Sequence, residues 1–170
     1  DAAHSTGATY KNRKIGSHGD LVCFSFHPVK NLAMPTGGLI AINSKNYKKI
    51  EKTLKEKRWC GITNRKGANY DVKNIGWNYY MNEFSAAIGL EQLKKLNHTN
   101  NRRREIAKTY SQKILTEKKM LFDNECSYHF YWIRVKNREQ FREKLLKKGI
   151  ETGIHYKPIH TFSLYKSKIK

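Results

Sequence analysis

The residues best placed to do chemistry lie in the stretch SFHPVK, from Ser25 to Lys30, directly after an apolar run. A lysine at the end of a buried strand is partly removed from water, which lowers the pKa of its ammonium group and yields a neutral amine. Such an amine forms a Schiff base with an aldehyde. The Ser25 hydroxyl and the backbone N–H groups of the turn can bind a phosphate. Among 34 Lys and Arg residues, however, one lysine near a strand end is most often a surface residue.

A carboxylate and an imidazole flank two small residues in the opening stretch, Asp1-Ala2-Ala3-His4. A carboxylate held against a pyridinium nitrogen keeps that ring protonated and makes it an electron sink, and a nearby imidazole can hydrogen-bond to the ring or stack on it. Taken alone, these four residues are also typical of an ordinary polar loop.

A third group, GWNYYM at residues 76–81, ends a polar stretch just before a predicted helix. A loop that enters a helix N-terminus is suited to binding anions. Its Trp77 and Tyr80 rings are equally suited to packing in a core. The run Arg102-Arg103-Arg104 predicts a solvated helix face, because charge runs usually lie in water.

Secondary structure must position these groups. The apolar run from Leu21 to Phe26 predicts a strand buried on both faces, as in a parallel sheet, and Leu39 to Ile42 predicts a second one. Helical spacing of apolar residues predicts an amphipathic helix from Lys45 to Arg58. The Gly- and Asn-rich residues 61–78 predict a long loop, and Asn82 to Leu96 carries the strongest helical periodicity.

The last third has a different pattern. After a break near Asn97, a basic helix is predicted from Arg102 to Leu115. A β-α-β unit follows, with a strand from Phe130 to Val135, a helix from Arg138 to Lys148 closed by Gly149, and a strand from Ile150 to Tyr156.

Composition limits the class of protein. The 170 residues carry a formal charge of +20, which predicts attraction to anions such as nucleic acid, nucleotides, phosphorylated cofactors or acidic membranes. Hydrophobic residues make up 38%, enough for a core, and no apolar run reaches the roughly 20 residues that span a bilayer. Cys23, Cys60 and Cys126 form no CxxC pair, so no zinc or other metal site is predicted and a reducing cytoplasm is expected. The start at Asp1, without Met or a secretory signal pattern, favours a fragment.

The motifs together resemble the DegT/DnrJ/StrS family of sugar aminotransferases. The resemblance extends over most of the chain, in order and spacing, and rests on DAAH at 1–4, GA at 7–8, GSHGD at 16–20, CFSFHPVKNL at 23–32, GG at 37–38, GWNYYMNE at 76–83, AAIGLEQL at 86–93 and GIHYKPIH at 153–160.

The resemblance implies an α/β protein with part of the aspartate-aminotransferase-like fold, pyridoxal-phosphate fold type I. Residues 1–96 would form the later part of the cofactor-binding large domain with an interface loop. Residues 97–170 would form a long helix and an incomplete small α+β domain. Because chains of this family are about twice as long, the 170 residues alone are expected to bind the cofactor weakly or not at all.

The resemblance also implies residue roles. Lys30 would form the Schiff base with pyridoxal 5'-phosphate, Asp1 would pair with the pyridine nitrogen, and Ser25 would bind the phosphate. His4 would lie by the ring and its 3-oxygen, where the family usually has Gln.

Two further roles follow from the same resemblance. Asn78 would reach the phosphate of the cofactor in the neighbouring subunit of a homodimer with shared active sites. His155, Tyr156 and His160 would line the substrate side.

The implied reaction is amino transfer from glutamate to the keto group of a nucleotide-linked sugar by a ping-pong cycle, with Lys30 moving the α-proton. Positive charge suits the diphosphate of such a substrate. A sugar dehydratase or a cyclitol aminotransferase of the same fold remains open, although Lys30, which some dehydratases replace with His, favours transamination. An inactive fragment also remains open. A basic nucleic-acid-binding protein, using the arginine run, Tyr79, Tyr80 and the C-terminal lysines, is disfavoured because the lysines are spread along the chain.

Overall fold

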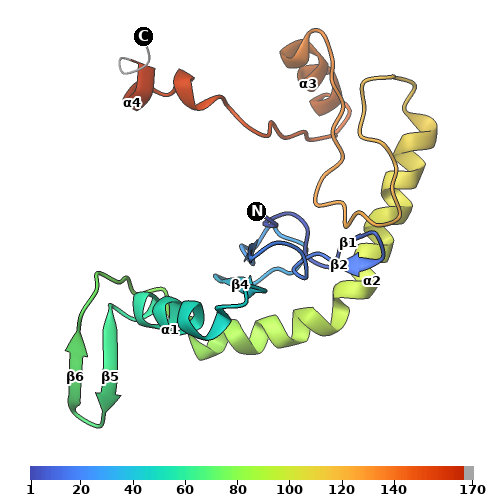
Figure 1. Ribbon diagram of the computed structural model, residues 1–170. Coiled ribbons are helices and arrows are strands. Elements are labelled where there is room, and N and C mark those ends of the chain that lie inside the picture. The colour runs from blue at the N-terminus through green and yellow to red at the C-terminus, as the bar shows by residue number, and fades with distance from the viewer. Residues whose placement is uncertain (167–170) are drawn as a thin grey trace. The chain divides into compact units, whose positions relative to one another are not determined.

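The computed structural model describes residues 1–166 and divides the chain into two compact units, Asp1–Trp132 and the residues from Ile133 onward. Figure 1 shows the ribbon, coloured by residue number. Lys168 and Lys170, two of the C-terminal lysines considered for nucleic-acid binding, lie outside the described residues.

The centre of the first unit is a pair of strands, β3 (Leu21–Ser25) and β4 (Gly38–Ile42). Both were predicted within one residue, but they pair with each other antiparallel, with Leu21 opposite Ile42 and Ser25 opposite Gly38. The connection between them contains no helix and returns the chain directly beside the strand that it left, whereas a parallel pair needs a longer crossover. The predicted burial of both faces is wrong for this chain, since Leu21, Leu39 and Ile40 are each more than two-fifths exposed.

Helix α1 (Tyr47–Arg58) follows β4 and agrees with the predicted helix except at its first two residues. A β-hairpin, β5 (Ile62–Lys66) and β6 (Asn69–Val72), occupies most of the region that was predicted as a loop. Nearly every side chain of this hairpin is exposed, so the alternation of apolar and polar residues that normally signals a strand is absent. Gly67, with φ of +60°, lies in its tight turn.

The segment from Gly76 to Tyr79 runs antiparallel along the end of α1. Trp77 N–H donates to the Lys57 carbonyl at 2.8 Å, and Tyr79 N–H donates to the Arg58 carbonyl at 2.9 Å. Trp59 and Asn78 form an isolated β-bridge. The two backbones approach so closely that a Cβ on Gly76 would lie 2.1 Å from the Gly61 nitrogen.

Helix α2 (Glu83–Lys113) is the longest element and runs without interruption through the break predicted near Asn97. The prediction failed because a polar residue, Asn100, occupies the buried face and interrupts the apolar periodicity; its side chain is only 1% exposed. The helix also ends two residues before the predicted Leu115.

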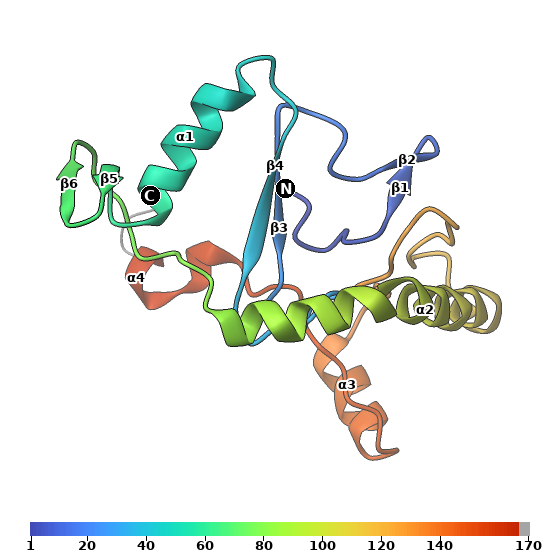
Figure 2. The ribbon, with the colours of Figure 1, turned by 90° about the horizontal axis from the view of Figure 1, so that it is seen from below.

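The apolar core lies where α2 passes the end of the β3–β4 pair (Figure 2). Leu32, Met34 and Leu96 are buried there, and Phe26 and Met81 pack against them. Gly89 of α2 leaves the space that the Met34 side chain fills, because a Cβ on this glycine would lie 2.7 Å from the Met34 sulfur. The core therefore joins the chain that follows β3 to the first half of α2.

A small hairpin, β1 (Thr9–Tyr10) and β2 (Arg13–Lys14), precedes the central strands. Its turn residues Lys11 and Asn12 have positive φ, and their backbone N–H groups donate to the Glu125 carboxylate at 3.1 and 2.7 Å. These hydrogen bonds, that to Asn12 above all, hold the pKa of the Glu125 carboxyl below its ordinary value. Glu125 thereby joins the N-terminal hairpin to the segment that follows α2.

The second unit contains α3 (Arg138–Leu146), the short 3-10 helix η1 (Ile159–Thr161) and α4 (Ser163–Lys166). The predicted helix is confirmed from Arg138 but ends at Leu146, two residues before the predicted Lys148. Gly149 follows with φ of +75°, and Gly149 N–H donates to the Leu146 carbonyl while Ile150 N–H donates to the Leu145 carbonyl. The two predicted flanking strands, Phe130–Val135 and Ile150–Tyr156, are not formed. Strand-like residues give a strand only where a partner pairs with them, so local pattern overstated these elements.

Within residues 1–166, every helix falls short of the length and apolar character that crossing a bilayer requires.

Gly76→Ala tests the close backbone approach at the end of α1. The new methyl group would force the two segments apart, and we expect a loss of about 1–3 kcal/mol in unfolding free energy. Hydrogen exchange at residues 57–61 should rise in protein expressed from the complete gene. Gly67→Ala is the control: its Cβ would meet nothing within 4 Å, so the alanine strains only the positive-φ turn of the β5–β6 hairpin and should leave exchange at 57–61 unchanged. Equal effects of the two variants would contradict the steric explanation.

Glu125→Gln tests the carboxylate that holds the β1–β2 turn. Because the folded pKa lies below the unfolded value of about 4.3, the carboxylate stabilises the fold above that pH, and its contribution is lost as pH falls through the folded pKa. The variant should therefore melt at a lower temperature than the wild type at pH 7. The difference should shrink steadily as pH falls below about 4. A difference that is independent of pH would refute a charge effect.

Candidate functional site

Lys30 lies in a turn that is tied at several points to the start of β4 and to the core. Lys30 N–H donates to the His27 carbonyl at 2.8 Å, and Phe26 N–H donates to the Gly37 carbonyl at 2.9 Å. Met34 N–H donates to the Phe26 carbonyl, also at 2.9 Å. The Lys30 side chain is half-buried. The turn thus presents one amine from a backbone that neighbouring hydrogen bonds hold in place.

Ser25 is the last residue of β3, and its Oγ accepts a hydrogen bond from His27 N–H at 3.3 Å. Its partner across the strand pair is Gly38, where a Cβ would lie 2.8 Å from the Phe24 carbonyl oxygen. A glycine is therefore needed beside Ser25 for the two strands to approach. The hydroxyl and the following N–H groups lie at the entrance to the lysine turn.

Asp1 is held beside β3 through its neighbour, because Ala2 N–H donates to the Cys23 carbonyl at 2.8 Å. Ala2 is 3% exposed, so this position accepts only a small side chain. The Asp1 carboxylate accepts a hydrogen bond from Ala3 N–H at 2.8 Å while the residue itself stays exposed. The loop thus carries a carboxylate next to the strand that leads to Ser25 and Lys30.

His4 stacks on a second imidazole, that of His129, with ring centroids 4.2 Å apart and planes inclined by 27°. The edge of the Phe130 ring contacts it as well, with centroids 5.4 Å apart. Ser127 Oγ donates to the His4 carbonyl at 3.4 Å. The segment from Ser127 to Phe130 therefore supports His4, and sequence reasoning missed it because nothing in a linear pattern pairs residues this far apart.

The predicted cofactor residues consequently lie on two separate parts of the backbone. Asp1, His4, Ser25 and Lys30 belong to the loop, strand and turn around β3. Asn78 lies on the segment paired with the end of α1, and its side chain is exposed. Its reach toward a neighbouring subunit stays a prediction.

The predicted substrate residues lie in the second unit. His155 and Tyr156 place their rings edge to face, with centroids 5.0 Å apart, and both are exposed. His160 belongs to η1 and is exposed too. Their role toward a substrate stays a prediction.

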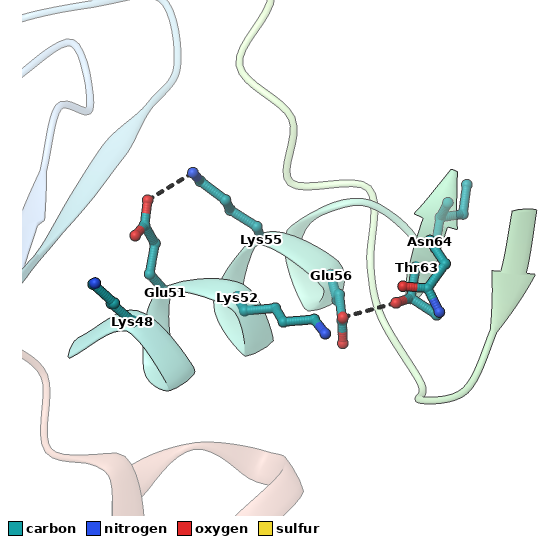
Figure 3. Close-up of a pocket in the computed structure, with 8 residues that line it drawn as sticks. Lys48, Glu51, Lys52, Lys55, Glu56, Thr63 and Asn64 are labelled. Carbon is teal, nitrogen blue, oxygen red and sulfur yellow. Dashed lines mark hydrogen bonds and ion pairs between the residues drawn. The ribbon is translucent and has the colours of Figure 1, made fainter. Parts of the chain in front are cut away.

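An open groove between α1 and β5 is separate from these residues (Figure 3). Lys55 pairs with Glu51 at 2.6 Å, and Thr63 Oγ1 donates to Glu56 at 2.8 Å. None of the predicted site residues lines it. Its ion pair is exposed, so the attraction is screened by water and contributes little.

The arginine run of α2 is a solvated face only in part. Arg102 pairs with Glu105, as expected. Arg103 Nη1 donates to the Tyr128 carbonyl at 3.5 Å, and Arg104 Nε donates to the Cys126 carbonyl at 3.1 Å. Two of the three guanidinium groups thus bond to carbonyls at the start of the segment that supports His4 or directly before it, which weighs against the run as a binding surface for phosphates.

The loop, the strand and the turn around β3 carry a carboxylate, an imidazole, a hydroxyl and an amine, which are the kinds of group that a pyridoxal-phosphate site requires. The whole chain, residues 1–170, matches the DegT/DnrJ/EryC1/StrS aminotransferase family. The chain belongs to this family, and the predicted resemblance is confirmed.

Relatives and solved structures agree with this membership. The chain is 38% identical, over 98% of its length, to UDP-4-amino-4,6-dideoxy-N-acetyl-beta-L-altrosamine transaminase of Campylobacter jejuni subsp. jejuni serotype O:2, of which it covers 46%. It is similar to Helicobacter pylori PseC, an aminotransferase involved in pseudoaminic acid biosynthesis, with 30% identity and a TM-score of 0.86 over 99% of this chain and 47% of that one. The PLP form of Spr1654, a putative sugar aminotransferase of Streptococcus pneumoniae, gives 28% identity and a TM-score of 0.89 over 100% of this chain and 46% of that one.

The chain therefore spans about half the length of the relatives it matches. The predicted fold class, a partial aspartate-aminotransferase-like fold of type I, is confirmed by these neighbours. Aminotransferases of this family are pyridoxal-phosphate-dependent, and a neighbouring structure contains that cofactor.

The donor set of this chain fits pyridoxal phosphate. The cofactor presents an aldehyde, a ring nitrogen, a 3-oxygen and a phosphate, and these call for an amine, a carboxylate, a hydrogen-bonding ring and a hydroxyl. Lys30, Asp1, His4 and Ser25 supply one group of each kind, all from the segments hydrogen-bonded to or continuous with β3.

Asn82→Ala tests how α2 begins, directly after the Asn78 segment. Asn82 Oδ1 accepts a hydrogen bond from Ser85 N–H at 2.8 Å and caps the helix. The alanine variant should lose about 1 kcal/mol of unfolding free energy in a urea titration. Asn82→Asp keeps the acceptor and should stay close to the wild type. An alanine variant as stable as the wild type would show that this cap is not needed.

Proposed function

We propose that the protein containing this chain is a pyridoxal-phosphate-dependent aminotransferase. In this proposal it transfers an amino group from glutamate to the keto group of a nucleotide-linked sugar in a ping-pong cycle. The observation that carries the proposal is family membership over all 170 residues, with Lys30 in the turn that follows β3. The name of a relative, a transaminase of a UDP-linked amino-dideoxy sugar, supports the substrate class.

The cofactor would be held by the residues around β3. Lys30 Nζ would bind its aldehyde carbon, the Asp1 carboxylate would hold a proton on its ring nitrogen, and the Ser25 hydroxyl would bind its phosphate. His4, whose ring is already supported by His129, would orient the ring through contact or a hydrogen bond to the 3-oxygen. When bound, pyridoxal phosphate supplies an electron sink for the carbon that carries the amino group.

Lys30 has a second task in this proposal. When the Lys30 amine is not bonded to the cofactor, it would take the proton from the α-carbon of glutamate. In the second half of the cycle it would give a proton to the sugar carbon that receives nitrogen. A base that moves protons must stay close to the reacting carbon through both halves of the cycle. The hydrogen bonds that hold the turn suit this requirement, because they limit how far the Lys30 backbone can move.

Substrate recognition would involve the second unit. His155, Tyr156 and His160 would line the substrate side, with imidazole and phenol groups that suit sugar hydroxyls and phosphate oxygens. The net charge of +20 would attract the diphosphate of a nucleotide-linked substrate. In the same proposal residues 1–96 belong to the large domain and residues 97–170 to the rest of the long helix and the small domain, with α2 continuous across that boundary.

A homodimer with shared active sites is part of the proposal. Asn78 would reach the cofactor phosphate of the partner subunit. Large apolar side chains around it are exposed, namely Ile75 at 81%, Trp77 at 60% and Tyr79 at 70%, and a partner surface would remove them from water. A cytoplasmic location is proposed because the three cysteines are free in the structure, as is usual in a reducing compartment.

Lys30→Ala tests the central assignment. The protein, expressed from the complete gene, is incubated with pyridoxal phosphate, reduced with borohydride and digested, and the modified lysine is located by mass spectrometry. We expect one dominant adduct on Lys30 in the wild type and its loss in the variant. Amino transfer from glutamate to a nucleotide-linked keto-sugar should fall by at least roughly a hundredfold.

Lys45→Ala, which removes an exposed lysine, is the matched control and should keep both the Lys30 adduct and the activity. Labelling spread evenly over many lysines in the wild type would overturn the assignment. A wild-type Lys30 adduct without transfer to any keto-sugar would retain the cofactor site and reject the proposed reaction.

A further inference from the structure

Asn100 is a polar side chain in the interior of the first unit, one turn of α2 before Arg103 and Arg104. It is 1% exposed and is among the most completely buried side chains that the structure describes. A buried amide is costly unless its donor and acceptor are both satisfied. Asn100 meets that requirement with partners from two other parts of the chain.

One partner comes from the lysine turn. Asn31, the residue directly after Lys30, donates from Nδ2 to Asn100 Oδ1 at 2.9 Å and to the Ser127 carbonyl at 2.6 Å. Asn31 therefore fastens the Lys30 turn to α2 and to the first residue of the segment that supports His4.

The other partner comes from the N-terminal loop. Asn100 Nδ2 donates to the Thr6 carbonyl at 3.0 Å. The chain passes Asn100 closely, since a Cβ on Gly7 would lie 2.4 Å from this nitrogen, and Gly7 has φ of +81°. The loop with Asp1 and His4 is thus fixed to the same helix position as the Lys30 turn.

The direction of these hydrogen bonds is fixed by chemistry. The Thr6 and Ser127 carbonyls can only accept, so the Asn100 and Asn31 NH₂ groups must face them. The Asn100 oxygen is then left to accept from Asn31, as observed. Any substitution that changes one donor or acceptor in this chain of bonds leaves a buried group without a partner.

We infer that Asn100 is a positioning residue for the cofactor site: with Asn31 it holds the Lys30 turn and the Asp1–His4 loop in register on α2. This inference rests on the proposed function, because the relative position of the Lys30 turn and the Asp1–His4 loop is important only if both bind the same cofactor. Asn100 acts through these two segments and has no contact with the reacting atoms in this account.

The test uses protein expressed from the complete gene, with Asn100→Ala, Asn100→Asp and Asn31→Ala as variants. Asn97→Ala is the matched control, because Asn97 is an exposed asparagine on the same helix. Hydrogen exchange is followed in residues 1–8 and 26–34, with residues 47–72 as the internal reference. Cofactor affinity is measured as the concentration of pyridoxal phosphate that gives half-maximal borohydride trapping on Lys30.

Asn100→Ala should speed exchange in both segments and weaken trapping by about tenfold, the effect of losing a buried hydrogen bond, with residues 47–72 unchanged. Asn100→Asp keeps an acceptor for Asn31 but has no donor for Thr6. It should therefore loosen residues 1–8 more than residues 26–34. Asn31→Ala should loosen residues 26–34 more, and combining it with Asn100→Ala should add less than the sum of the two effects.

Unchanged exchange in residues 26–34 of Asn100→Ala would overturn the inference, as would an equal rise across all three regions, which indicates general destabilisation. If Asn100→Ala fails to fold, the two other variants still test the inference, because Asn100→Asp should raise exchange more in residues 1–8 and Asn31→Ala more in residues 26–34. The same pattern of exchange in both variants would then overturn it. Failure of the proposed function has a different signature: the wild type forms no Lys30 adduct, while the exchange pattern of the variants is unaffected by that result.

Discussion

The first unit depends on one constraint, that polar groups taken out of water must find hydrogen-bond partners. Its largest fully buried side chains among the described residues are polar, namely Asn100, Ser85 and Ser127, and the apolar core beside them is small. Asn100 connects the N-terminal loop and the lysine turn to α2, and Ser127 Oγ donates a hydrogen bond to the His4 carbonyl. Directional hydrogen bonds therefore set where the segments with the proposed cofactor residues lie, and apolar packing at Met34 and Leu96 supports those segments.

The elements with strong local signals could be predicted from the sequence. The apolar runs gave β3 and β4, and helical periodicity gave α1, the first half of α2 and α3 with its glycine end. Pairing could not be predicted in the same way. The antiparallel β3–β4 register, the exposed hairpin β5–β6 and the unbroken α2 depend on partners that are distant in sequence or on side chains that face water.

The candidate site shows the same division. Lys30, Asp1, His4 and Ser25 could be proposed because their motifs match a family in order and spacing, and the structure brings their segments together around β3. Their supports could not be proposed. His129, Asn100, Arg103 and Arg104 carry no local signal, since an imidazole, an amide or a guanidinium reveals its role only through the carbonyl or ring that it meets.

In the proposed function, nitrogen passes from an amino acid to a sugar at a site built around Lys30. The most direct measurement is to supply ¹⁵N-glutamate, pyridoxal phosphate and a panel of nucleotide-linked keto-sugars to protein expressed from the complete gene, and to follow the label by mass spectrometry. We predict ¹⁵N in one sugar nucleotide, with 2-oxoglutarate formed in equal amount. Loss of oxygen from the sugar without gain of nitrogen would contradict the account and identify a dehydratase.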